Sequence, residues 1–188
     1  MIKKLDAKTL SHLYEAEMTA TFPRAELKPL KAMLRMQAEG RYDVLGYYSE
    51  DGALLAYACV CTAAEPVLLD YLAVVASHRG EGLGSRFLGA LLAATDLYPA
   101  IMLEIEAVSD AADDDDHTMR ARRQTFYERL GFIRTTTEAS VFGEHYWVFD
   151  SRAHLGRHSV SDAMAAIYHY MVPEKDAYEN NVRIWDGQ

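Results

Sequence analysis

The segment with the densest chemical signal is a run of glycines between an apolar stretch and residues at helical spacing. It reads Arg79, Gly80, Glu81, Gly82, Leu83, Gly84 and Ser85. Glycine lets the backbone turn tightly and approach a ligand closely. The free N–H groups at the start of the following helix attract an anion, above all a pyrophosphate. The spacing therefore predicts a phosphate-binding loop between a strand and a helix.

Two familiar phosphate-binding motifs fit this loop poorly. A P-loop requires Gly-Lys followed by Ser or Thr, whereas residues 84–86 read Gly-Ser-Arg. A Rossmann turn requires Gly-x-Gly-x-x-Gly and an acid about twenty residues later, and Glu104 and Glu106 lie near that distance. The third glycine comes one position early, however, and no second strand–helix–strand repeat follows. A dinucleotide-dependent oxidoreductase therefore stays only as an alternative, which stabilisation by NAD would revive.

A second motif lies downstream, where residues 126–132 read Phe-Tyr-Glu-Arg-Leu-Gly-Phe. Together the two motifs resemble the GNAT superfamily of N-acetyltransferases, whose CoA-binding signature is Arg/Gln-x-x-Gly-x-Gly/Ala between a central strand and a helix. Arg79, Gly82 and Gly84 match that signature residue for residue. The family's second signature, an aromatic residue and Tyr followed by Gly-Phe, matches the downstream motif in the expected order and separation.

The resemblance implies acetyl-CoA, or another short acyl-CoA, as co-substrate and no metal. The residues that it places at the cofactor are Val74, Val75, Arg79, Gly80, Glu81, Gly82, Leu83, Gly84, Ser85 and Tyr127. Pantetheine would pair with the backbone near Val74 and Val75, where one N–H group would polarise the thioester carbonyl. Tyr127 is the implied acid that protonates the departing CoA thiolate.

An amine nucleophile is mostly protonated at neutral pH, so a base must accept its proton. Glu104 is the first candidate, because it and Glu106 project from the same face of a predicted strand. Asp70 is the third candidate, as a lone acid in an otherwise apolar strand. The sequence leaves the choice among these three carboxylates open.

The expected reaction is therefore direct transfer of an acetyl or short acyl group from acyl-CoA to an amine within one ternary complex. The alternative is a non-catalytic acyl-CoA-binding sensor or assembly module of the same fold. The formal net charge of −9 fits a cationic small-molecule or peptide acceptor and disfavours a nucleic-acid partner, which needs a basic patch. A homodimer remains open.

The elements that must position these residues follow from hydrophobic periodicity. Helices are predicted over residues 6–18, 29–39, 83–95, 118–130 and about 159–172, and strands over residues 42–49, 54–62, 67–75, 101–108, 132–136 and 141–149. This order predicts an α+β fold with a GNAT-like mixed central sheet of about six to seven strands flanked by helices. We expect a single domain over residues 1–188, with a core at about 1–150 and a C-terminal helical extension at about 151–188.

Other polar and sulfur-containing residues receive simpler interpretations. Cys59 and Cys61 lie two apart in an apolar strand, so we expect reduced core thiols. The chain shows neither a secretory signal nor a membrane-spanning run, so we expect a cytoplasmic protein with no membrane partner. His154 and His158 have helical spacing, but Gly156 lies between them and no Glu completes a zinc motif. We therefore predict no metal site.

Charged side chains gather around the helix that carries the second motif. Three arginines, Arg120, Arg122 and Arg123, precede Tyr127 where the family often has an asparagine. CoA phosphates or Glu104 are conceivable partners for them, but a solvated basic face is the preferred interpretation. Asp110 and residues 113–116 are expected to favour the positive end of this helix, with a cation-attracting lip as the alternative.

Overall fold

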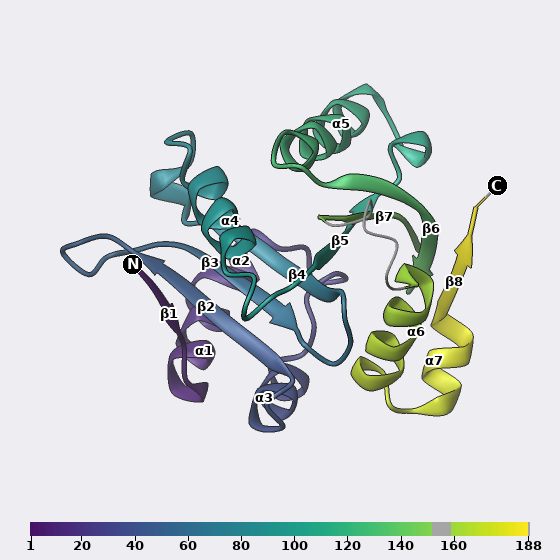
Figure 1. Ribbon diagram of the computed structural model, residues 1–188, viewed down its shortest axis with the longest axis horizontal. Helices are drawn as coiled ribbons and strands as arrows, with labels where there is room; N and C mark the ends of the chain where they lie inside the picture. Colours follow the sequence, from purple (N-terminus) through teal and green to yellow (C-terminus); the bar gives the residue numbers. More distant parts are fainter. Residues whose placement is uncertain (152–158, 188) are drawn as a thin grey trace. The chain divides into compact units, whose positions relative to one another are not determined.

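The computed structural model describes residues 1–151 and 159–187, which contain eight strands in one mixed sheet (Figure 1). The strand order is β1-β2-β3-β4-β5-β7-β6-β8. The chain forms two compact units, one of residues 1–62 and 69–87 and the other of residues 63–68 and 88–188. The mixed sheet with flanking helices confirms the predicted fold class. The assignment of one domain to residues 1–188 stays a prediction.

The first unit is built on antiparallel strands and on helices from the beginning of the chain. Its elements are β1 (Ile2–Lys4), α1 (Ala7–Leu13), a π-helical turn (Tyr14–Met18), α2 (Thr19–Thr21), α3 (Leu30–Ala38), β2 (Tyr42–Tyr48) and β3 (Leu54–Cys61). Asp6 caps α1 by accepting the Thr9 N–H at 2.8 Å. Strand β2 pairs antiparallel with both β1 and β3.

Two elements contribute residues to both units, namely β4 (Val67–Val74) and α4 (Leu83–Ala93). The second unit otherwise contains β5 (Ile101–Glu106), α5 (Asp114–Arg129), β6 (Ile133–Val141), β7 (Glu144–Asp150), α6 (Val160–Met171), α7 (Lys175–Asn181) and β8 (Val182–Asp186). Val67 and Leu68 pair in parallel with the start of β5, whereas the other pairings of this unit are antiparallel. Within this unit, β5 therefore lies between β4 and β7.

The structure corrects several element boundaries. Strand β6 continues to Val141 and turns into β7 through Phe142 and Gly143, whose φ values are +50° and +95°. The predicted strand over residues 132–136 is therefore too short, because β6 includes residues 137–141 as well. Strands β1 and β8 were not predicted, since three and five residues carry too little periodicity. With β1 and β8 included, the described residues contain eight strands, whereas about six to seven were predicted.

Each unit buries its own apolar residues. In the first, Tyr57, Met33 and Met36 are fully buried, as are Cys59 and Cys61. No disulfide joins the two cysteines, which confirms the interpretation of reduced core thiols. Within residues 1–151 and 159–187, no helix combines the length and the apolar character needed to cross a bilayer.

Candidate active site

The glycine loop connects β4 to α4 in the first unit, as predicted. A short 3-10 turn (Ala76–His78) follows β4, and Arg79 is extended before the two glycines that turn the chain. Gly80 and Gly82 adopt φ values of +86° and +72°, which L-residues with a side chain rarely tolerate. A Cβ atom at either position would meet nothing within 4 Å. The backbone conformation therefore requires glycine, and open space adjoins the loop.

Side chains next to the loop stabilise its turn. Arg79 donates from Nε to the Val74 carbonyl at 3.3 Å, and the Arg86 guanidinium donates to the Glu81 carbonyl at 3.0 Å. The buried Leu83 anchors the first turn of α4, which also contains Gly84 and Ser85. The N–H groups at this helix start are the donors that a phosphate would use.

The backbone at the end of β4 is partly engaged by a neighbouring strand. The Val75 N–H, one of the two predicted donors to a thioester, donates to the Leu55 carbonyl at 3.0 Å. Tyr71 on β4 also binds the turn between α2 and α3, because its hydroxyl donates to the Glu26 carbonyl and accepts the Lys28 N–H. Strand β4 therefore holds residues 22–29 through Tyr71 and also positions the glycine loop that follows it.

Tyr127 lies on α5 in the second unit. Its ring makes edge contacts with Phe126 and Phe132, with centroids 5.0 and 5.8 Å apart, so the second motif is a packed aromatic cluster. Burial raises the pKa of Tyr127 to about 12. The phenol is consequently protonated throughout the physiological range and available as a proton donor. The predicted residues thus divide between the units, with the glycine loop in the first and Tyr127 and Glu104 in the second.

The three candidate carboxylates have different partners. Asp70 pairs with Lys28 Nζ at 2.7 Å and also accepts a hydrogen bond from Tyr42. Glu106 forms an ion pair with Arg123. Glu104 accepts a hydrogen bond from the Tyr168 hydroxyl at 2.7 Å. Asp70 and Glu106 are therefore each held by a cation, while a neutral phenol contacts Glu104.

The contacts of α5 correct the expectation of a solvated basic face for Arg120 and Arg123, whereas Arg122 is exposed as expected. Arg120 pairs with Asp116 at 2.9 Å and donates to the Ala107 carbonyl at 3.0 Å, and Arg123 binds Glu106. The reason is that one side of α5 lies against β5 and the segment after it, where acceptors are available. Periodicity did not reveal these partners, because they lie on other elements.

The acidic segment at the beginning of α5 caps and stabilises that helix. Asp113 accepts the Asp116 N–H at 2.8 Å as N-cap, and residues 114–116 form the first helical turn. Negative charge at this end stabilises the helix. This confirms the preferred interpretation and extends the helix four residues before its predicted start at Thr118.

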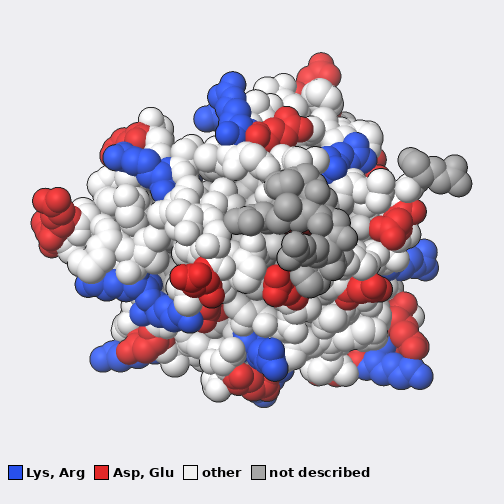
Figure 2. Space-filling view, viewed as in Figure 1, with Lys and Arg blue, Asp and Glu red and all other residues white. Residues whose placement is uncertain are grey.

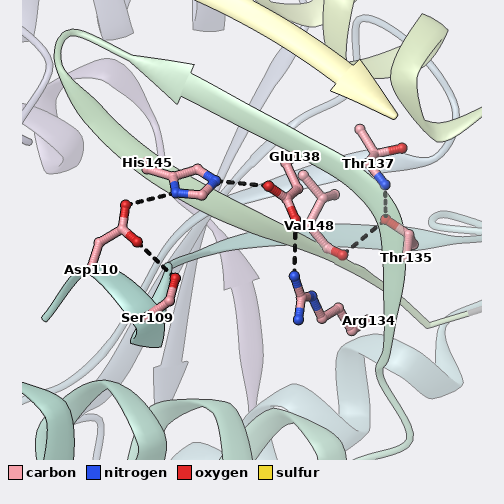
Figure 3. A network of polar contacts seen from close by, with 8 residues as sticks. All are labelled: Ser109, Asp110, Arg134, Thr135, Thr137, Glu138, His145 and Val148. Atoms are coloured by element: carbon pink, nitrogen blue, oxygen red, sulfur yellow. Dashed lines mark hydrogen bonds and ion pairs between the residues drawn. The ribbon is translucent and has the colours of Figure 1, made fainter. Parts of the chain in front are cut away.

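Sequence analysis missed a polar network centred on His145 of β7 (Figure 3). Its Nδ1 lies 2.8 Å from Asp110 and its Nε2 lies 2.9 Å from Glu138 on β6, which also binds Arg134. The ring stacks on Trp185 of β8 with centroids 5.5 Å apart. No sequence pattern signals this network, because the pairing of β6 with β7 and β8 brings its members together.

Protonation of His145 should stabilise the protein. Burial lowers the pKa of His145, but hydrogen bonds to Asp110 and Glu138 together raise it above its ordinary value of 6.5. The stabilisation is therefore complete below about pH 6.5 and is lost as pH rises through the higher pKa of the folded state. Urea unfolding of the native protein and a His145→Gln variant should show a difference that shrinks from pH 6 to pH 9.

An exposed histidine provides the control for this measurement. His12 lies at the end of α1 and is exposed, so a His12→Gln variant is the matched substitution at an exposed position. A constant difference between the native protein and the His145→Gln variant across this range would contradict the assigned charge state.

The described part of the chain holds no cluster of three or more His, Cys, Asp or Glu side chains arranged for a metal ion. His154 and His158, the pair considered in the sequence analysis, lie outside the described residues.

Comparison with known proteins identifies the domain that carries these features. Residues 42–134 match the acetyltransferase (GNAT) domain model. None of the curated proteins matches this sequence.

Three solved structures illustrate the likeness in fold. A GNAT-family protein of Bacteroides thetaiotaomicron, described as an acetyltransferase, has a TM-score of 0.67 at 16% identity, covering 92% of this chain and 97% of its own. The ribosomal-protein-S18-alanine N-acetyltransferase of Escherichia coli has a TM-score of 0.59 at 21% identity, covering 80% and 91%. The spermidine N-acetyltransferase of Vibrio cholerae, solved with CoA and spermine, has a TM-score of 0.58 at 8% identity, covering 80% and 93%.

The matched segment contains the glycine loop, the strand that carries Glu104, and Tyr127. Residues 42–134 therefore match a GNAT acetyltransferase domain, and the chain has the fold of the GNAT-family structure from Bacteroides thetaiotaomicron.

Proposed function

We propose that the protein transfers an acetyl or similar short acyl group from acyl-CoA to a primary amine. The observation that carries this proposal is the glycine loop of the matched domain, with two positive-φ glycines, a helix start and open space beside it. This arrangement suits the pyrophosphate of CoA, since it presents backbone N–H groups and demands no side-chain rearrangement.

The proposed chemistry is direct attack by the amine. The amine nitrogen forms a bond to the thioester carbon, the carbon–sulfur bond breaks, and the thiolate leaves with its electron pair. Glu104 takes the proton of the amine, and Tyr127, whose high pKa keeps it protonated, supplies the proton for sulfur. Much of the acceleration would come from holding the amine and the thioester together.

A covalent acyl-enzyme has no support from the cysteines. Cys59 is fully buried, and burial raises the pKa of its thiol far above the ordinary value, so little thiolate forms. Cys61 is fully buried as well. Both thiols therefore serve packing in this proposal.

An amine acceptor is supported by what the structural neighbours act on. Their names specify spermidine, the alanine of ribosomal protein S18 and an aminoglycoside, which all present an amine. The net charge of −9 is compatible with a cationic acceptor. Figure 2 shows both acidic and basic side chains of the described residues on the face in view, and the net charge of −9 disfavours a nucleic-acid partner. We propose a cytoplasmic location; a homodimer remains open.

The test is a turnover assay with acetyl-CoA and a panel of spermidine, an alanine-initiated peptide and an aminoglycoside. We expect thiol release that depends on one of these amines, together with protection of the protein against heat by acetyl-CoA and not by NAD. Mass spectrometry during turnover should show no acetylated Cys59 or Cys61. Acetylation of either thiol would contradict direct transfer.

The same assay separates the proposal from its alternatives. Heat protection by acetyl-CoA without turnover of any amine would favour the binding module. Protection by NAD alone would favour the oxidoreductase.

A further inference from the structure

Helix α6 lies outside the matched domain, yet one of its side chains reaches a candidate catalytic group. The buried face of α6 consists of Ala163, Met164, Ile167, Tyr168 and Met171. Tyr168 is only 4% exposed, and its hydroxyl donates to Glu104 Oε2 at 2.7 Å. A buried phenol requires a hydrogen-bond acceptor, and a carboxylate is a strong one. Sixty-four positions in the chain separate the two residues.

Both carboxylates of β5 are oriented by side chains that come from helices. Glu104 and Glu106 project to the same face of β5, because side chains alternate along a strand. Arg123 of α5 holds Glu106, and Tyr168 of α6 holds Glu104. The two contacts differ chemically, since Arg123 donates from a charged guanidinium whereas Tyr168 donates from a phenol hydroxyl, which sets the direction of the carboxylate oxygen that it binds.

We propose that Tyr168 is a positioning residue that orients Glu104 for removing a proton from the acceptor amine. This inference rests on the proposed function, in which Glu104 is the base. It gives the segment after residue 150, whose role the sequence left open, a part in the reaction. Proton removal requires the accepting oxygen to lie within hydrogen-bond reach of the amine, and a carboxylate free to rotate meets that geometry less often.

The proposal makes a kinetic prediction for a Tyr168→Phe variant, which keeps the ring and removes the hydroxyl. A hydrogen bond to a charged group is lost, so kcat should fall about ten- to one-hundred-fold. The KM for acetyl-CoA should stay within roughly twofold, because the glycine loop is unchanged. A loss of folded protein would instead reduce the active fraction equally at every substrate concentration, and thermal unfolding measures that fraction independently.

A double variant tests whether Tyr168 acts through Glu104. If it does, the Glu104→Gln, Tyr168→Phe double variant should be no slower than Glu104→Gln alone. A Tyr178→Phe variant is the matched control, because it removes a phenol hydroxyl from α7. The ring of Tyr178 stacks on His169 of α6. This control should keep the native kcat.

The outcomes separate the inference from the function on which it rests. A native protein that acetylates none of the three amines would overturn the proposed function and the positioning role with it. An active native protein whose Tyr168→Phe variant keeps full kcat would overturn the positioning role alone. So would independent, multiplicative losses in the double variant.

Discussion

Replacing Gly82 and Gly84 together by glutamate should abolish binding of acetyl-CoA while the protein remains folded. Both glycines border the start of α4, and the Gly82 position opens onto free space, so a new side chain there would enter the region assigned to phosphate. Two added carboxylates would repel the pyrophosphate and compete for the helical N–H groups. We expect isothermal titration to show affinity at least about one-hundred-fold weaker than that of the native protein.

Stability must be controlled in this experiment, because Gly82 has a φ value of +72° and a side chain there costs about 1 to 2 kcal/mol. Gly52, in the β2–β3 hairpin, has a φ value of +88° and equally open surroundings. A Gly52→Glu variant therefore adds similar strain and charge away from the loop, and it should bind acetyl-CoA normally. Unchanged affinity of the double variant for acetyl-CoA would show that the glycine loop does not bind the phosphates.

An Asp70→Ala substitution should lower the free energy of unfolding by about 3 kcal/mol. The side chain of Asp70 is 5% exposed and accepts hydrogen bonds from Lys28 Nζ and the Tyr42 hydroxyl. Burial and the adjacent charge of Asp70 raise the pKa of Tyr42 well above its ordinary value, so Tyr42 is a neutral donor. Removing the carboxylate leaves a poorly solvated ammonium and a buried hydroxyl without this acceptor. Loss of one partner of a buried pair costs about 3 to 5 kcal/mol, and the 23% exposure of Lys28 favours the lower value.

Urea unfolding measures this effect, and a surface ion pair supplies the comparison. Asp43 pairs with Lys4, whose side chain is 59% exposed, so Asp43→Ala should cost at most about 1 kcal/mol. Adding Lys28→Met to the Asp70→Ala variant should restore part of the lost stability, because the cation that has lost its carboxylate is then removed. Equal losses in the free energy of unfolding for Asp70→Ala and Asp43→Ala would show that burial does not increase the contribution of the Asp70–Lys28 pair to stability.

The sequence by itself determined the features that depend on neighbouring residues. Glycine at positions 80 and 82 indicated a turn, which has positive φ values in the structure, and the apolar residues at helical spacing from Leu83 onward predicted a helix. Capping by Asp6 and Ser159 is local in the same way, since a cap and the N–H group that it accepts lie within three residues. The GNAT resemblance rested on two such local motifs.

Only the tertiary structure decided which partner each carboxylate has. The sequence offered Asp70, Glu104 and Glu106 as candidate bases with Glu104 first, whereas the fold shows that their partners include an ammonium, a phenol and a guanidinium, respectively. Those partners lie at least 17 positions away along the chain, beyond any helical or strand period. Likewise His145 meets Asp110 and Glu138 only because the strands pair in one register. Periodicity records which face a side chain occupies, while the packing of distant elements determines what it touches there.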